Sequence, residues 1–144
     1  MYLEHLDLWN FKSYSAASVD FSADINCIVG SNGSGKTNLL DAVYYLSMSK
    51  SAFSVSEAQN IRHGENWMMI AGSVKKNQHN VRLVASYSLE QKKKTFAIDK
   101  KEYEKISEHI GFLPSVLISP DDTALIKEGS ELRRKFFDSM ISQI

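Results

Sequence analysis

The feature that most constrains this chain is the spacing G-x-x-x-x-G-K-[ST], which begins at Gly30 and ends at Thr37. The apolar run from 27 to 29 comes directly before it and predicts a buried strand, in which Cys27 is a small buried residue. Beyond Thr37, apolar residues recur at helical spacing as far as Met48. A strand, a glycine loop and a helix in this order are typical of a phosphate-binding loop.

Each residue type in this loop has a chemical reason. Glycines let successive backbone N–H groups converge on phosphate oxygens, and the positive end of the following helix favours a bound anion. We expect the Lys36 ammonium to lie against the β and γ phosphates of ATP, and the Thr37 hydroxyl to bind the bridging Mg²⁺ ion. Lys12 is a further candidate phosphate contact, with a solvated lysine as the alternative. The predicted nucleotide-binding residues of the loop are Gly30, Ser31, Asn32, Gly33, Ser34, Gly35, Lys36, Thr37 and Asn38.

Two strands are predicted ahead of the loop. The first covers 2–11 and, by strict alternation, places Leu8 and Phe11 on opposite faces. A turn at 13–17 then leads to a second short strand at 19–21. This antiparallel start is typical of ATP-binding cassette ATPases and differs from the β-α-β start of small nucleotide kinases.

Length and composition limit the remaining possibilities. At 144 residues and 43% hydrophobic content, the chain is large enough for one well-packed domain. No apolar run reaches the roughly 18 residues of a membrane span, and the start does not resemble a signal peptide, so we expect a cytoplasmic protein without membrane contact. The single cysteine excludes disulfides and cysteine metal sites within these residues.

The formal charge of the chain is zero, but it is unevenly spread. Residues 75–105 hold nine basic residues against four acidic ones, an excess of five positive charges. Such asymmetry indicates a polyanion partner such as DNA, whereas lysines that protect a solvated hairpin edge are the alternative. The candidate DNA-binding residues are Lys75, Lys76, Lys92, Lys93, Lys94, Lys100 and Lys101.

The middle of the chain predicts an antiparallel meander. Its strands are expected at 67–74, 81–89 and 95–98, with the charged residues in the turns. A short helix at 103–110 and an apolar strand at 115–118 follow.

Two neighbouring carboxylates come after that strand. Because a proline precedes them, Asp121 and Asp122 are expected to cap a helix at 123–127, and the alternative is a metal-holding acid that partners Thr37. A last helix is predicted from residue 130 to 144. No glycine, proline or polar turn ends it, so we expect the chain to be the front portion of a longer protein.

Six stretches of the chain recur together in one known family. They are Leu8-x-Asn10-Phe11-Lys12-Ser13-Tyr14, the loop from 30 to 38, Leu40-Asp41-Ala42-Val43-Tyr44-Tyr45-Leu46, Ile61-Arg62-His63-Gly64, Ile118-Ser119-Pro120-Asp121-Asp122 and Gly129-x-x-x-Arg133-Arg134-x-Phe136-x-Asp138. The ordered set resembles the N-terminal part of the RecF family of bacterial DNA replication and repair proteins, in the branch of cassette ATPases that includes the SMC proteins. Phe53 departs from the family pattern, because Ser54 follows it where an arginine is usual.

The resemblance implies an α/β fold, namely a phosphate-loop NTPase core lobe of the ATP-binding cassette type with an antiparallel β-meander. It divides the chain into strands, loop and first helix (1–50), the meander (66–101), and helices with a strand that lead to a truncated arm (103–144). The family's signature motif, Walker B aspartate, catalytic glutamate and switch histidine are absent from this sequence. Weak ATPase activity is therefore expected of a complete dimeric protein, and none of this stretch alone.

The resemblance also implies an ATP-dependent DNA-binding function in recombinational repair and replication restart after DNA damage. Such a protein would bind single-stranded, gapped or duplex DNA, form an ATP-dependent homodimer, and help recombination mediator proteins to load recombinase. The alternatives are another SMC-like or overcoming-lysogenization-type ATPase, a phosphate-loop small-molecule kinase, and a nucleotide-free structural module. The length of the helical arm would distinguish another ATPase of the same branch from a RecF-type protein. A kinase would need a substrate lid and a second acidic strand.

Overall fold

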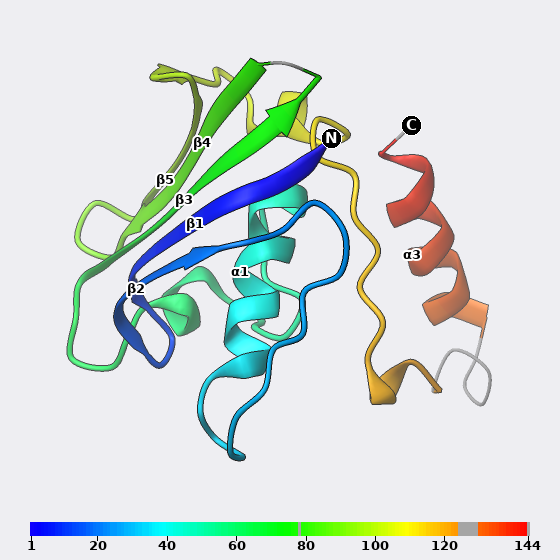
Figure 1. Cartoon of the computed structure of the whole chain (residues 1–144), viewed down its shortest axis with the longest axis horizontal. Coiled ribbons are helices and arrows are strands. Elements are labelled where there is room, and N and C mark those ends of the chain that lie inside the picture. The colour runs from blue at the N-terminus through cyan, green and yellow to red at the C-terminus, as the bar shows by residue number, and fades with distance from the viewer. Residues whose placement is uncertain (78, 124–129, 144) are drawn as a thin grey trace.

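One antiparallel sheet of six strands organises the molecule (Figure 1). The computed structural model describes residues 1–77, 79–123 and 130–143. In space the strand order is β2-β1-β3-β4-β5-β6, so the first hairpin and the meander belong to one sheet. In chain order the strands are β1 (Tyr2–Phe11), β2 (Tyr14–Asp20), β3 (Trp67–Lys76), β4 (His79–Ser88), β5 (Lys93–Ile98) and β6 (Lys101–Glu102).

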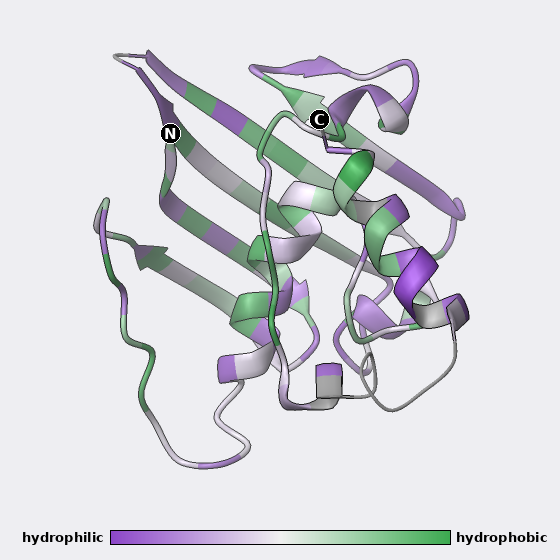
Figure 2. Cartoon of the chain, turned by 90° about the vertical axis from the view of Figure 1, so that its right-hand side faces the viewer, coloured by the Kyte–Doolittle hydropathy of each residue, from purple (hydrophilic) through white to green (hydrophobic). Residues whose placement is uncertain are grey.

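The helices lie on one side of this sheet. α1 packs against the sheet, and α3 stands outside it beside the extended stretch that follows residue 113 (Figures 1 and 2). None of the helices in the described ranges is long and apolar enough to cross a bilayer. The described helices are α1 (Lys36–Met48), the 3-10 helices η1 (Glu57–Asn60), η2 (Ile106–His109) and η3 (Pro120–Thr123), and α3 (Ser130–Ile141).

The hydrophobic core lies between the sheet and α1. Apolar and polar residues alternate along the strands, which Figure 2 shows as bands of two colours, so one face of the sheet is apolar. The helix contributes Tyr45 and Leu46 to this core, and the strands contribute Leu6, Ile70 and Phe96; all five are fully buried. Burial of each such side chain is worth about 2 kcal/mol. This packing fixes α1, and with it the loop that precedes Lys36.

Phe11 lies on the core face, which corrects the prediction from strict alternation. Asn10 has a left-handed backbone with φ 48°, so the alternation of side chains breaks just before the strand ends. As a result Phe11 is fully buried together with Leu6 and Leu8, and its ring meets Tyr45 edge-on with centroids 6.3 Å apart. A local backbone conformation therefore overrides the two-residue period.

The main predicted elements are confirmed. β1 covers 2–11 as expected, α1 ends at Met48, and β3, β4 and β5 form the predicted meander. The meander strands differ from the predicted ranges because the turns are tighter than expected. Asp99 and Lys100 both have positive φ, 45° and 70°, which is the two-residue geometry that suits a hairpin.

Two predicted strands are not strands among the described residues. The run 27–29 before the loop and the run 115–118 after Pro114 are extended, but neither is paired with another described strand. Cys27 is exposed and not buried, and Ile118 exposes 84% of its surface. Both strand predictions are therefore wrong for the described residues, because a ladder needs a hydrogen-bonding neighbour, and local sequence does not supply one.

Two smaller predictions also need correction, and a third cannot be compared with the described residues. β2 begins at Tyr14, which pairs with Phe11. The turn is therefore formed by Lys12 and Ser13 alone, and not by residues 13–17 as predicted. The helix expected at 103–110 is reduced to the single turn of η2. Asp122 accepts a hydrogen bond from the backbone N–H of Ser119 at 2.5 Å, and the helix that it was expected to cap falls mostly outside the described residues.

Gly72 marks the closest approach of α1 to the sheet. A Cβ atom at this position would lie 2.5 Å from Cδ1 of Leu46 and 3.0 Å from Cδ1 of Leu3. We therefore expect Gly72→Val to destabilise the fold by about 1–3 kcal/mol, because both leucines must leave their packed positions. Urea unfolding would measure this. Ser73→Val, on the opposite face of the same strand, is the matched control, and an equal effect of both substitutions would contradict the packing argument.

Candidate nucleotide-binding site

The loop at 30–35 has the backbone that its glycines predict. Gly33 and Gly35 have φ of 81° and 94°, in the left-handed region that side chains disfavour. A Cβ atom at Gly35 would also lie 2.9 Å from Oγ of Ser13 and 3.0 Å from the hydroxyl of Tyr14. Gly35 is followed directly by α1, so the free N–H groups of the first helical turn point toward the loop.

The Lys36 side chain folds back over this loop. Its ammonium donates hydrogen bonds to the carbonyl oxygens of Gly30 at 2.8 Å and Ser31 at 2.7 Å. Among the described residues no carboxylate forms an ion pair with it, so its positive charge is not neutralised. A cavity of about 270 Å³ opens beside it. The cavity is lined by Asn32, Gly33, Gly35, Lys36, Thr37 and Asn38.

These residues fit an anion such as a phosphate group. The cavity walls offer backbone N–H groups, an ammonium and a hydroxyl, and no acidic side chain. The cavity therefore brings together six of the predicted residues, while Gly30 and Ser31 bind the lysine through their carbonyl oxygens. Ser34 does not line the cavity, and its side chain lies next to Gly30.

The turn between β1 and β2 supports the loop from behind. The Tyr14 hydroxyl donates to the carbonyl oxygen of Gly35 at 3.1 Å, and the Asn38 side-chain amide donates to Oγ of Ser13 at 2.9 Å. Burial raises the pKa of Tyr14, so its hydroxyl keeps its proton and remains a donor at neutral pH. Sequence reasoning did not assign this role to Ser13 and Tyr14, because the contact joins residues distant in the chain.

Lys12 forms a buried ion pair. Its ammonium lies 2.5 Å from Oδ2 of Asp41, a fully buried residue of α1, and 3.3 Å from Oγ of Ser51. Asp41 also accepts hydrogen bonds from Oγ of Ser51 and from the backbone N–H of Ala52, both at 2.7 Å. A phosphate contact by Lys12 therefore stays a prediction, whereas its contact with Asp41 is observed. The sequence analysis did not predict this pair; an acidic residue at a helix position that faces the core is the signal that could have indicated it.

The candidate DNA-binding lysines lie at two opposite ends of the sheet. One end holds the turn between β3 and β4 and the end of β5, because Lys76 pairs with His79 and Leu83 pairs with Ile98. This end carries Lys75, Lys76, Lys100 and Lys101. Of these, Lys75 lies 3.9 Å from Glu4, and the ammonium of Lys76 lies 5.0 Å from the ring centre of Phe112. In the described ranges, Lys76, Lys100 and Lys101 form no ion pair.

The other three lysines, Lys92 to Lys94, are at the far end of the same strands. Lys94 is not a surface group, because its ammonium pairs with Glu57 at 2.5 Å and contacts the carbonyl oxygen of Ser49. Lys93 lies 3.4 Å from Glu102. This end therefore offers fewer unneutralised cations than the first.

The glycine loop opens onto a helix, an antiparallel hairpin precedes it, and a meander in the same sheet follows it. This arrangement defines a phosphate-loop ATPase lobe of the ATP-binding cassette type. A model of the RecF/RecN/SMC N-terminal domain matches residues 2–123, and the chain belongs to this family. The predicted resemblance and fold class are thus confirmed.

Two curated relatives illustrate the similarity. The DNA replication and repair protein RecF of Flavobacterium johnsoniae is 50% identical over 144 residues, which are all of this chain and 40% of that protein. RecF of Cytophaga hutchinsonii is 46% identical over 143 residues, or 99% of this chain and 37% of the relative. The chain thus spans about two fifths of the length of these relatives.

Solved structures agree with this assignment. A structure of the recombination mediator protein RecF-ATP in the RecFOR pathway superposes with a TM-score of 0.92 at 28% identity, covering 99% of this chain and 38% of that one. A structure from work on the ATP-driven dimerization and DNA-stimulated activation of SMC ATPases has a TM-score of 0.78 at 22% identity, covering 97% and 99%. The second match supports the fold alone.

The buried pair of Lys12 and Asp41 generates a stability prediction. Lys12→Met should destabilise the fold by about 3 kcal/mol or more, because it leaves a buried carboxylate without its counter-charge. Asp41→Asn should also destabilise it, and the double variant should lose less than the sum of the two single losses. Urea unfolding of the four proteins measures this coupling.

The exposed pair of Arg62 and Glu65, 3.8 Å apart, is the matched control. Its charge-neutralising variants, Arg62→Gln and Glu65→Gln, should each change stability by less than about 1 kcal/mol. Additive effects of Lys12→Met and Asp41→Asn would show that the two groups are not coupled.

Proposed function

We propose that this chain is the ATP-binding part of a RecF-type protein that acts on DNA in recombinational repair and replication restart. The observation that carries the proposal is the loop beside α1, in which an unneutralised lysine, two left-handed glycines and a helix start surround one cavity. ATP is the nucleotide that appears with the similar RecF structure. Family membership directs the proposal from nucleotide binding in general to DNA repair.

The residues of the loop suit Mg-ATP. The backbone N–H groups and the ammonium of Lys36 would hold the phosphates, and the hydroxyl of Thr37 would be a Mg²⁺ ligand. Thr37 is exposed, so its hydroxyl is accessible to an ion. When bound, Mg²⁺ neutralises phosphate charge.

The proposal extends to the assembly. We infer weak hydrolysis and an ATP-dependent homodimer. The dimer is in keeping with the ATP-driven dimerization described for the SMC ATPase whose fold this chain shares. Partners would be single-stranded, gapped or duplex DNA and recombination mediator proteins. The similar RecF structure is itself described as a recombination mediator protein in the RecFOR pathway, which supports a role in recombination. We place this function in the bacterial cytoplasm.

The first test concerns Lys36. Lys36→Ala should weaken Mg-ATP binding roughly tenfold or more, because it removes a charged hydrogen-bond donor that is oriented by two backbone carbonyls. Equilibrium titration with a fluorescent ATP analogue measures the affinity. Lys105→Ala, which removes an exposed lysine at the other side of the fold, is the control. Equal affinities for the two variants would overturn the nucleotide assignment.

The second test concerns DNA. We propose that phosphates of DNA contact the sheet end that carries Lys75, Lys76, Lys100 and Lys101, because three of these four lysines form no ion pair within the described residues. Replacing Lys100 and Lys101 by Gln should weaken binding to duplexes of any sequence alike. The log–log salt dependence should become shallower by about one unit per lost contact.

The matched control replaces Lys92 and Lys93 by Gln, since this pair also lies at a hairpin turn but at the opposite end. Lys94 is left in place because it is part of the fold. A change in salt slope with the control pair, and none with Lys100 and Lys101, would place the DNA at the other end of the sheet.

A further inference from the structure

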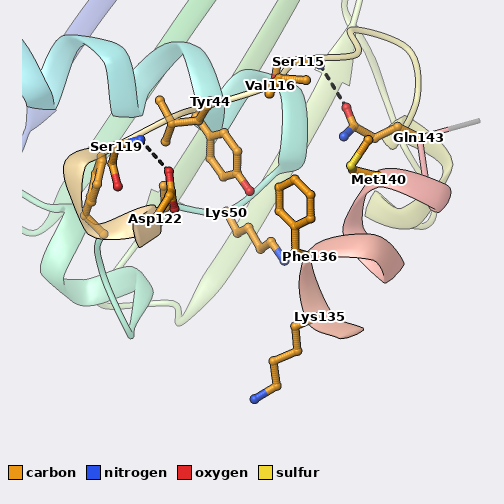
Figure 3. A pocket seen from close by; sticks show the side chains of 13 residues that line it. Tyr44, Lys50, Ser115, Val116, Ser119, Asp122, Lys135, Phe136, Met140 and Gln143 are labelled. Carbon is orange, nitrogen blue, oxygen red and sulfur yellow. Dashed lines mark hydrogen bonds between the residues drawn. The ribbon is translucent and has the colours of Figure 1, made fainter. Parts of the chain in front are cut away.

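A second cavity, of about 300 Å³, lies between α1 and α3 and shares no lining residue with the cavity beside the phosphate loop. We name it the α1–α3 cavity. Figure 3 shows how it is built: Tyr44 projects from α1, Phe136 projects toward it from α3, and Ser119 and Asp122 close the side formed by the extended stretch. Its volume is ample for one nucleobase and too small for a folded partner.

Aromatic rings form the apolar part of this cavity. Phe136 and Phe53 line the cavity and expose 39% and 45% of their surfaces among the described residues. The ammonium of Lys12 lies 5.8 Å from the ring centre of Phe53, so Phe136 is the ring that can accept another flat ring. Stacking of a base on such a ring is worth roughly tenfold or more in affinity and tolerates any base.

Charged groups frame the rings. Lys50 lines the cavity and is exposed, and no carboxylate in the described ranges pairs with it. Lys135 also lines the cavity but lies 2.8 Å from Glu131. Lys50 is therefore the cation that can meet a phosphate group.

One acidic group is held in a fixed position. Oδ2 of Asp122 accepts the hydrogen bond from the backbone N–H of Ser119, which orients the carboxylate and leaves Oδ1 as an acceptor. Cytosine, adenine and guanine carry an exocyclic amine that can donate to such an oxygen, whereas thymine does not. The cavity thus combines a stacking face, a cation and an oriented acceptor.

We propose that the α1–α3 cavity binds one unstacked nucleotide, with its base against Phe136 and its phosphate at Lys50. The favoured source is a single-stranded stretch of nucleic acid, because the cavity lies on the surface and the chain presents no second glycine loop for a free triphosphate. This inference deepens the DNA-binding part of the proposed function and rests on it.

The test measures binding of a short fluorescent oligo(dC) strand by the full-length protein, with oligo(dT) and dCMP as separate arms. Phe136→Ala should weaken oligo(dC) binding roughly tenfold or more. Phe137→Ala is the matched control, because this neighbouring ring is 57% exposed, touches Phe136 edge-on and does not line the cavity. Phe136→Trp keeps a stacking face and should retain affinity, which separates loss of the ring from loss of folding.

Two further variants test the polar contacts. Lys50→Gln should weaken binding and make its salt dependence shallower by about one unit. Asp122→Asn should reduce the preference for oligo(dC) over oligo(dT). Binding of dCMP with the same dependence on Phe136 would support the site with a free nucleotide as its source.

Equal effects of Phe136→Ala and Phe137→Ala would overturn the inference. If replacing Lys100 and Lys101 still weakens duplex binding in that case, the proposed function stands, and only nucleotide binding in the α1–α3 cavity is excluded. If the wild-type protein binds neither duplex nor single strands while Lys36-dependent ATP binding is intact, the inference and the DNA part of the proposed function both fail.

Discussion

The buried carboxylate of Asp41 is the interaction on which the surroundings of the phosphate loop depend. A charge inside a protein is stable only with a partner and satisfied hydrogen bonds, and Asp41 finds them in Lys12, Ser51 and Ala52. These partners come from the turn before the loop and from the segment after α1. One side chain therefore ties both flanking segments to the helix, and the same turn then holds Gly35 from behind through Tyr14.

Lysines in this chain illustrate how environment decides what one residue type does. Lys12 and Lys94 are held by the carboxylates of Asp41 and Glu57 and serve the fold. Lys36 is held only by backbone carbonyls, so its charge remains available to an anion. Lys100 is exposed at a surface turn and forms no ion pair within the described residues. Counting positive charges along the sequence does not separate these three situations.

Much of the fold could be predicted from the sequence, because alternation, helical spacing and the glycine loop are local signals. The exceptions are informative. Phe11 was placed on the wrong face because a left-handed residue at Asn10 leaves no trace in hydropathy. The run 27–29 was expected to be a paired strand, although pairing depends on a neighbour distant in the sequence. In the candidate site, Lys36 and Thr37 were predicted by their motif, whereas the roles of Asp41 and Tyr14 needed three-dimensional contacts.

The two unpaired extended segments also affect how this chain behaves before it meets any ligand. Val29 and Val116 expose 88% and 71% of their surfaces, and each belongs to a segment whose backbone groups lack strand partners in the described part of the chain. Extended apolar segments with open edges are what holdase chaperones recognise and what intermolecular β-pairing uses. A protein made of these residues alone should therefore self-associate as its concentration rises, because the open edges of two copies can pair with each other.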